Sequence, residues 1–129
     1  MNGVNLLQVQ HTYGEALTRL HHDLPDYFEA IVETKFDGSD TPYRFRRPQG
    51  RPSSHERDLP LTVDVEVATF ELADRLQDDV LENFMRTWPR CPGHPHPMRP
   101  QLDERKAVWA CPATGSTVAE IGTLVDALR

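Results

Sequence analysis

Residues 61–84 read LTVDVEVATFELADRLQDDVLENF, and the spacing of their apolar residues changes part-way along. Over residues 61–67 apolar and polar residues alternate strictly, which is typical of a β-strand with one buried face. From Thr69 the apolar residues recur at intervals of three and four, which predicts a helix ending near Thr87. A strand followed directly by an amphipathic helix favours an α+β fold.

The predicted helix has an apolar face and an acidic face. The apolar face consists of Phe70, Ala73, Leu76, Val80 and Phe84. The acidic face consists of Glu71, Asp74, Asp78, Asp79 and Glu82. We interpret the acidic face as a solvated surface, and the alternative is a docking surface for a partner.

Residues 13–36 are predicted to be helical. An apolar stripe at helical spacing runs through Leu17, Leu20 and Leu24. Pro25 interrupts it, and because proline does not fit a helix interior we expect a kink there or a second short helix that includes Val32. Adjacent helical residues point about 100° apart, so His21, His22 and Asp23 are interpreted as a solvated polar face rather than a metal site.

A basic segment follows these residues. Its aromatic side chains predict a strand at 43–47, and the prolines and glycines of 48–60 predict a long loop. The segment carries the candidate nucleic-acid-binding residues Arg44, Arg46, Arg47 and Arg51. Aromatic side chains stack on bases and arginine neutralises phosphate, whereas the alternative is an exposed strand and loop in which arginine supplies solubility. The net charge of −6 disfavours nucleic acid as a partner.

Length and composition exclude other classes of protein. A chain of 129 residues is expected to form one domain. No apolar run approaches the roughly 18 residues that span a bilayer, so no membrane partner is expected. The start, MNGVNLLQVQH, lacks the basic and apolar regions of a signal peptide, which favours a cytoplasmic location. Two cysteines are too few to hold together a secreted disulfide scaffold of this length.

The C-terminal third differs in composition from the rest. Residues 90–100, RCPGHPHPMRP, hold four prolines without helical or strand periodicity and predict a constrained loop. Residues 107–111 and 117–124 predict two short strands separated by a turn. With the earlier elements, these strands complete a predicted α+β fold with a small antiparallel sheet.

Two segments of this region share one local pattern. They are Cys91-Pro92-Gly93-His94 and Cys111-Pro112-Ala113-Thr114-Gly115. The pattern resembles a degenerate zinc ribbon, a family in which two knuckles written CPxCG direct two ligands each at one Zn²⁺. The resemblance covers residues 88–122 and implies a zinc-ribbon-like β-hairpin module within the single domain. The same stretch resembles a C-terminal cassette of small uncharacterised bacterial proteins, which implies no activity.

The match to the zinc ribbon departs from the family pattern at two positions. His94 replaces the second cysteine of the first knuckle, and Thr114, a poor zinc ligand, replaces that of the second. The resemblance therefore implies Cys91, His94 and Cys111 as ligands, and His96 is the nearby residue that would complete four. The alternatives are a ribbon that holds no metal and a disulfide between the two cysteines.

A zinc ion with four protein ligands has no open position for water, so its expected role is structural. The chain is then expected to be a binding or accessory protein with a protein partner. This role favours a protein that is not an enzyme. If His96 is not a ligand, a three-ligand site with bound water could serve a metal-dependent enzyme. Such an enzyme would need a general base, and Glu104 and Glu120 are the nearest glutamates in the sequence.

Overall fold

The computed structural model of the chain describes residues 6–24, 32–34, 43–45 and 59–124. Its elements, in chain order, are α1 (Leu6–His21), β1 (Val32–Thr34), β2 (Tyr43–Phe45), α3 (Val65–Phe84), β3 (Arg99–Asp103), β4 (Lys106–Ala110) and β5 (Thr117–Glu120). The predicted α+β class is confirmed. Neither described helix is long and apolar enough to cross a bilayer.

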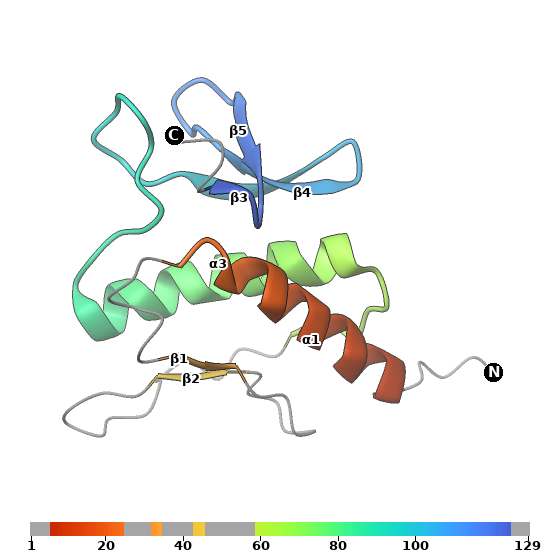
Figure 1. Cartoon of the computed structure of the whole chain (residues 1–129). Helices are drawn as coiled ribbons and strands as arrows, with labels where there is room; N and C mark the ends of the chain where they lie inside the picture. The colour runs from red at the N-terminus through yellow and green to blue at the C-terminus, as the bar shows by residue number, and fades with distance from the viewer. Residues whose placement is uncertain (1–5, 25–31, 35–42, 46–58, 125–129) are drawn as a thin grey trace.

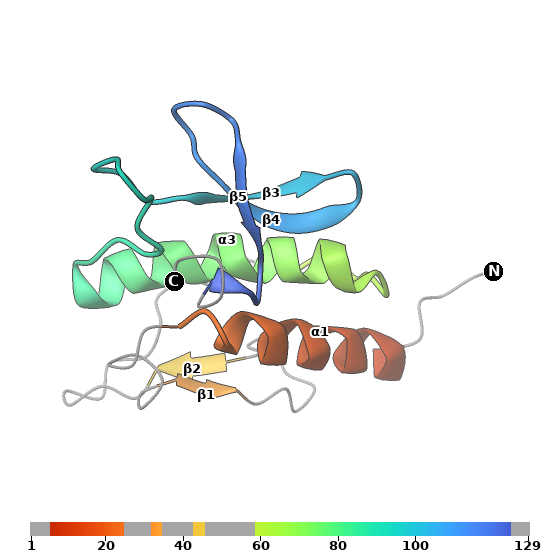
Figure 2. The same cartoon turned by 45° about the horizontal axis from the view of Figure 1, so that its top comes forward.

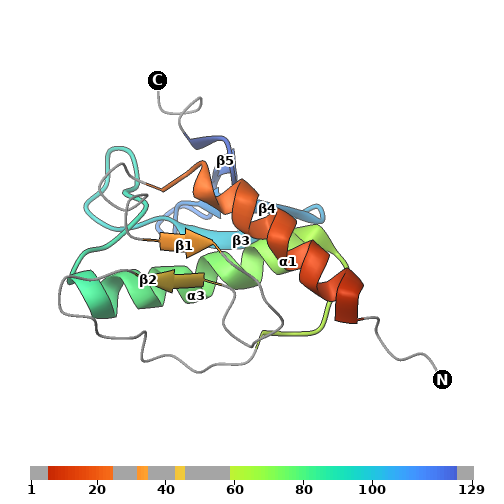
Figure 3. The same cartoon turned by 60° about the horizontal axis from the view of Figure 1, so that its bottom comes forward.

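The two helices pack against each other and lie between two sheets. Strands β3, β4 and β5 form an antiparallel sheet in that order, and α3 contacts β3 and β4. Strands β1 and β2 form a separate antiparallel pair. Figures 1 and 2 show the three-stranded sheet on one side of the helices and the β1–β2 pair on the other. Figure 3 shows the β1–β2 side, with α1 crossing α3.

Helix α1 supplies one wall of the core and ends before Pro25. The predicted apolar stripe of Leu17, Leu20 and Leu24 is buried, as expected. The prediction of a second helix is wrong over residues 32–34, which pair with β2 instead. β-branched residues such as Val32 favour strands once a pairing partner exists. The rest of the predicted second helix lies outside the described residues.

The predicted strand at residues 61–67 is wrong, because helix α3 begins inside it. Asp64 caps the helix: its Oδ1 accepts the backbone N–H groups of Glu66 (2.9 Å) and Val67 (3.4 Å). Leu61 and Val63 are 62% and 56% exposed, so the alternating apolar residues do not face a core. The cap satisfies backbone donors locally, whereas a strand here would need a neighbouring strand.

Helix α3 forms the opposite wall of the core. Ala73, Leu76 and Val80 are buried as predicted, and Phe70 is partly buried. Further buried apolar residues of this helix are Ala68 and Leu72. On the predicted acidic face, Glu71, Asp74 and Asp78 are half-buried rather than fully solvated. The side chains of Phe84, Asp79 and Glu82 lie outside the described residues.

The C-terminal strands form a hairpin with a third strand added. Strands β4 and β5 confirm the two predicted strands, although β5 ends at Glu120. Strand β3 begins at Arg99, inside the segment predicted as loop, and pairs with β4 from Arg99 opposite Ala110 to Asp103 opposite Lys106. Pro100 is tolerated because β3 is an edge strand of this sheet. The sheet and both helices share one cluster of buried side chains, which includes Trp88 and Trp109.

Candidate metal centre

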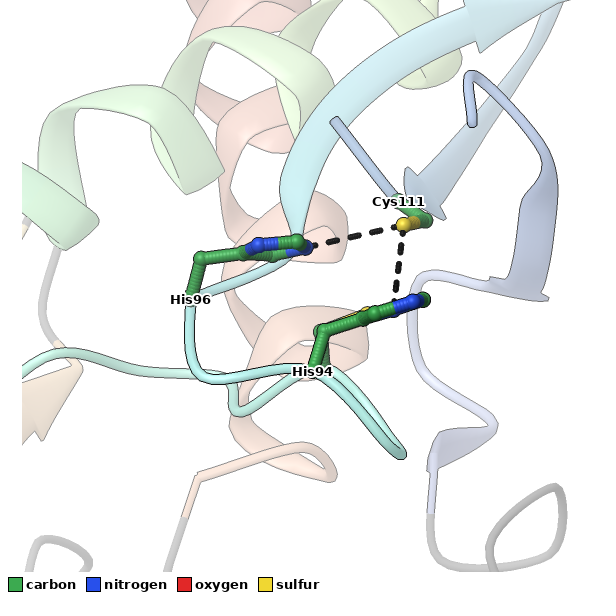
Figure 4. A group of neighbouring side chains, drawn as sticks. His94, His96 and Cys111 are labelled. Atoms are coloured by element: carbon green, nitrogen blue, oxygen red, sulfur yellow. Dashed lines mark hydrogen bonds between the residues drawn. The ribbon is translucent and has the colours of Figure 1, made fainter. Parts of the chain in front are cut away.

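Four side chains from the two knuckles converge at one end of the β3–β4 hairpin. They are Cys91, His94, His96 and Cys111, whose ligand atoms all lie within 4.8 Å of one another and could hold a metal ion. Pairing of Arg99 with Ala110 places the loop that precedes β3 beside the residue that follows β4. Figure 4 shows His94 and His96 pointing toward Cys111.

The sulfur-to-nitrogen distances match those of a tetrahedral site. Nδ1 of His94 lies 3.4 Å from Sγ of Cys91 and 3.5 Å from Sγ of Cys111. Nε2 of His96 lies 3.6 Å from Sγ of Cys111. In a tetrahedral zinc site with Zn–S of about 2.3 Å and Zn–N of about 2.0–2.1 Å, the S···N separation is about 3.6 Å. Three sulfur-to-nitrogen separations are therefore close to those of one tetrahedral ion, and all four ligand atoms lie within 4.8 Å of one another.

The first knuckle is a tight turn that brings two histidines to one point. The backbone N–H of Cys91 donates to the His96 carbonyl (3.0 Å), and that of His94 donates to the Cys91 carbonyl (3.3 Å). Gly93 has a φ of 75°, which glycine adopts without strain. The two imidazole rings stack with centroids 5.1 Å apart. His94 presents Nδ1 and His96 presents Nε2, so side chains one residue apart can reach the same centre.

Helix α3 holds the two ends of this knuckle together. Nε2 of Gln77 donates to the carbonyl of Trp88 at 2.9 Å and to that of Met98 at 2.5 Å. The backbone N–H of Met98 also donates to the carbonyl of Pro89 at 2.8 Å. These bonds therefore hold the two ends of the loop, at Trp88 and Met98, at a fixed separation.

The second knuckle contributes one ligand residue and a set of donors around it. The Cys111 N–H donates to the Ser116 carbonyl (2.9 Å), and the Gly115 N–H donates to the Cys111 carbonyl (2.7 Å). Gly115, like Gly93, has a φ of 75°. Thr114 stands at the position of the missing cysteine, where its hydroxyl lies 2.8 Å from that of Ser116 and accepts the backbone N–H of Ser116 at 3.1 Å. It therefore stabilises the turn that follows Cys111.

The two thiols have different electrostatic environments. The Thr114 hydroxyl, His96 and the backbone amides of Thr114 and Ala113 bond to Cys111 and lower its pKa to about 5. Burial and its bond to Cys111 raise the pKa of Cys91. Cys111 is thus the thiolate of the pair, which is the ionisation state that binds metals.

The cluster is buried on its sulfur side and open on its histidine side. Cys91 and Cys111 are 3% and 4% exposed, His96 is half-buried and His94 is exposed. A hollow of about 540 Å³ borders Cys91 and His94. Both cysteines are free, so no disulfide joins them in this structure.

The sequence also predicted an arginine cluster and two glutamates as candidate functional residues. Arg44 lies on β2, and Arg46, Arg47 and Arg51 lie outside the described residues. Glu104 lies in the β3–β4 turn, at the end of the hairpin away from Cys111. Glu120 is exposed at the end of β5.

The interpretation of Asp23 as part of a solvated polar face is wrong. Asp23 is only 6% exposed, because the chain turns inward after α1 and N–H groups of the C-terminal region surround its carboxylate. No local motif in the sequence signals this role, since its partners are distant in the chain.

Comparison of the chain with protein-family models, curated proteins and solved structures gave no match. The resemblance to a zinc ribbon thus rests on the two knuckles alone. In the structure, these four residues form a group able to hold a metal ion.

Proposed function

We propose that this chain binds one Zn²⁺ through Cys91, His94, His96 and Cys111, and that the ion has a structural role. The observation that carries this proposal is the spacing of the donors, with S···N separations of 3.4 to 3.6 Å. These three separations are close to those of a tetrahedral zinc complex. Loss of the Cys91 proton on metal binding would give two thiolates, whose charge balances that of the ion.

The type of donor favours zinc among the common metals. A tetrahedral set of two sulfurs and two nitrogens suits Zn²⁺, whereas Mg²⁺ and Ca²⁺ prefer oxygen ligands. A cytoplasmic location would keep both thiols reduced and available to the metal. Zinc is therefore the metal we assign to the site.

The arrangement favours a structural site over a catalytic one. Four protein donors leave no coordination position for water, so the ion could not activate a nucleophile. Glu104, one of the two candidate bases, lies at the far end of the β3–β4 hairpin. We therefore infer a binding or accessory protein, in which the metal stabilises the surface that a protein partner would contact.

Metal analysis of the purified full-length chain tests this proposal. We expect about one zinc per chain by mass spectrometry of the metal content, with retention through dialysis. Cys111→Ser and His96→Ala should each weaken zinc binding strongly, since each removes one of four ligands. The matched control His22→Ala removes an exposed histidine of the N-terminal region and should bind zinc like the wild type.

Two results would contradict the proposed zinc site. A wild-type chain that contains no zinc, and that takes up none when reduced and dialysed against Zn²⁺, would overturn the proposal. Zinc binding that survives Cys111→Ser unchanged would place the metal elsewhere and would also overturn it.

A further inference from the structure

Asp23 is a buried carboxylate that accepts hydrogen bonds from the segments around both cysteines. It lies just after the end of α1. Its Oδ2 accepts the indole N–H of Trp109 (2.8 Å) and the backbone N–H of Gly122 (2.6 Å), and its Oδ1 accepts the backbone N–H of Leu124 (3.0 Å). Its backbone carbonyl accepts the indole N–H of Trp88 (3.0 Å). One residue therefore orients both tryptophans of the chain.

Each of these tryptophans precedes one cysteine of the candidate metal centre. Trp88 lies three residues before Cys91, and Trp109 lies two residues before Cys111. The two indole rings contact edge to face, with centroids 5.2 Å apart and an interplanar angle of 78°. The two knuckles are therefore tied, through the tryptophans, to one another and to the end of α1.

We propose that Asp23 is a positioning residue for the metal centre, setting the separation of the Cys91 and Cys111 sulfurs through Trp88 and Trp109. This inference rests on the proposed function, because it requires that the cluster binds a metal. The separation matters because Zn–S bonds of about 2.3 Å require the two sulfurs to lie about 3.8 Å apart. Residues that orient ligands from outside the coordination sphere change metal affinity by about 10–100-fold.

The chemistry of the site explains why a carboxylate suits this position. Three N–H donors converge on the side chain of Asp23, and an ionised carboxylate has acceptor capacity for all of them. Asparagine would offer one oxygen, and its NH₂ group would face at least one of these donors. A buried donor would then lose its partner: the N–H of Leu124 if the amide oxygen took the Oδ2 position, or those of Trp109 and Gly122 if it took the Oδ1 position.

The test compares Asp23→Asn with a control variant in α1, Arg19→Gln. This control removes the bonds of Arg19 to the carbonyls of Ile121 (2.6 Å), just after β5, and Ala107 (3.2 Å) in β4, and its ion pair with Glu66, and none of these partners is a tryptophan. For each full-length variant, the Zn²⁺ affinity is measured by chelator competition, and the absorption spectrum of bound Co²⁺ reports the coordination geometry.

We expect Asp23→Asn to weaken Zn²⁺ binding by about 10–100-fold and to alter the Co²⁺ absorption bands. Arg19→Gln should lower the stability of the fold while its Co²⁺ spectrum and Zn²⁺ affinity stay close to those of the wild type. Equal changes in both variants would show that Asp23 acts only through general stability, and would overturn the inference.

A second variant keeps the test valid if Asp23→Asn does not fold. Trp109→Phe keeps an aromatic ring but removes the indole donor to Asp23, and we expect it to shift the Co²⁺ bands and weaken Zn²⁺ binding. If both variants fold, the double variant should lose less affinity than the product of the two single losses, because both remove one bond. A wild-type spectrum and affinity in Trp109→Phe would overturn the inference.

The failures of the two proposals are distinguishable. A wild-type chain that binds neither Zn²⁺ nor Co²⁺ overturns the proposed function itself. A wild-type chain that binds both, together with an Asp23→Asn variant of unchanged affinity and spectrum, overturns only the role of Asp23.

Discussion

Tyr13 is a buried phenol whose hydroxyl group has a defined partner. Its side chain is almost fully buried in the core, and its O–H donates to the carbonyl of Pro60 at 2.6 Å. Burial, with a smaller contribution from the negative charge of Glu71, raises the pKa of Tyr13 to about 12. The bond joins α1 to the segment that leads into α3.

This pKa predicts a loss of stability at alkaline pH. Because the folded chain holds the phenolic proton more tightly than the unfolded chain, with its pKa near 10, the stabilisation is complete below pH 10 and is lost as pH rises toward 12. Tyr13→Phe should cost about 1 kcal/mol at pH 8, from the lost hydrogen bond. Urea unfolding of both proteins from pH 8 to 12 should show the wild-type advantage shrinking above pH 10. A constant difference across that range would contradict the assignment.

At the start of helix α3, a helix cap decides whether residues 61–67 form a strand or lead into a helix. Residues 61–67 alternate as a strand would, yet Asp64 accepts two backbone N–H groups of the first helical turn. The hydroxyl of Thr62 accepts the N–H of Asp64 at 3.0 Å and fixes the approach of the chain. No strand among the described residues pairs with this segment, and the cap satisfies its backbone groups instead.

We therefore expect Asp64→Ala to lower the free energy of unfolding by about 1 kcal/mol, the usual contribution of a helix N-cap. Val63→Thr is the control: because Val63 is exposed, this change should have almost no effect in the helical structure. Were residues 61–67 a half-buried strand, Val63→Thr would be the costlier change. Chemical denaturation followed by circular dichroism measures both variants.

At the scale of the whole molecule, the candidate metal centre is continuous with the core. Cys91 and Cys111 belong to the same buried cluster as Trp109 of β4 and the apolar faces of α1 and α3. Arg19 of α1 forms an ion pair of 2.7 Å with Glu66 of α3 and donates to the carbonyl of Ala107 in β4, so it joins both helices to the sheet. A metal bound at the knuckles would therefore stabilise the complete fold.

If the chain binds zinc as proposed, removal of the ion should lower the stability of the full chain and not of the knuckles alone. A ligand that binds only the folded state raises the unfolding free energy by RT ln(1 + [L]/Kd), so the melting temperature should rise with free Zn²⁺ and fall on chelation. We expect one thermal transition, followed by circular dichroism of the helices and by tryptophan emission. The control, Cys111→Ser, should show no dependence on zinc. A wild-type melting temperature that is independent of zinc would contradict this coupling.

The features that could be predicted from sequence are those with a local physical origin. The helical spacing of Leu17 and Leu20 predicted a buried face, because the period of an α-helix places such residues on one side. Strands β4 and β5 were predicted from local sequence as well, because residues 107–111 and 117–124 are short strand-like stretches separated by a turn. The β3 strand was missed, because its proline-rich start carries no strand pattern and it depends on pairing with β4.

The sequence by itself determined which residues are candidate donors, because Cys91, His94 and His96 lie in one short segment and Cys111 begins the second knuckle. Only the tertiary structure decided that the four ligand atoms meet within 4.8 Å. That meeting follows from the β3–β4 pairing, which sets the segment before β3 beside the residue after β4, and Asp23, far away in the chain, hydrogen-bonds to the tryptophan that precedes each cysteine. Contacts between residues so distant in the chain follow from packing, which local residue preferences do not specify.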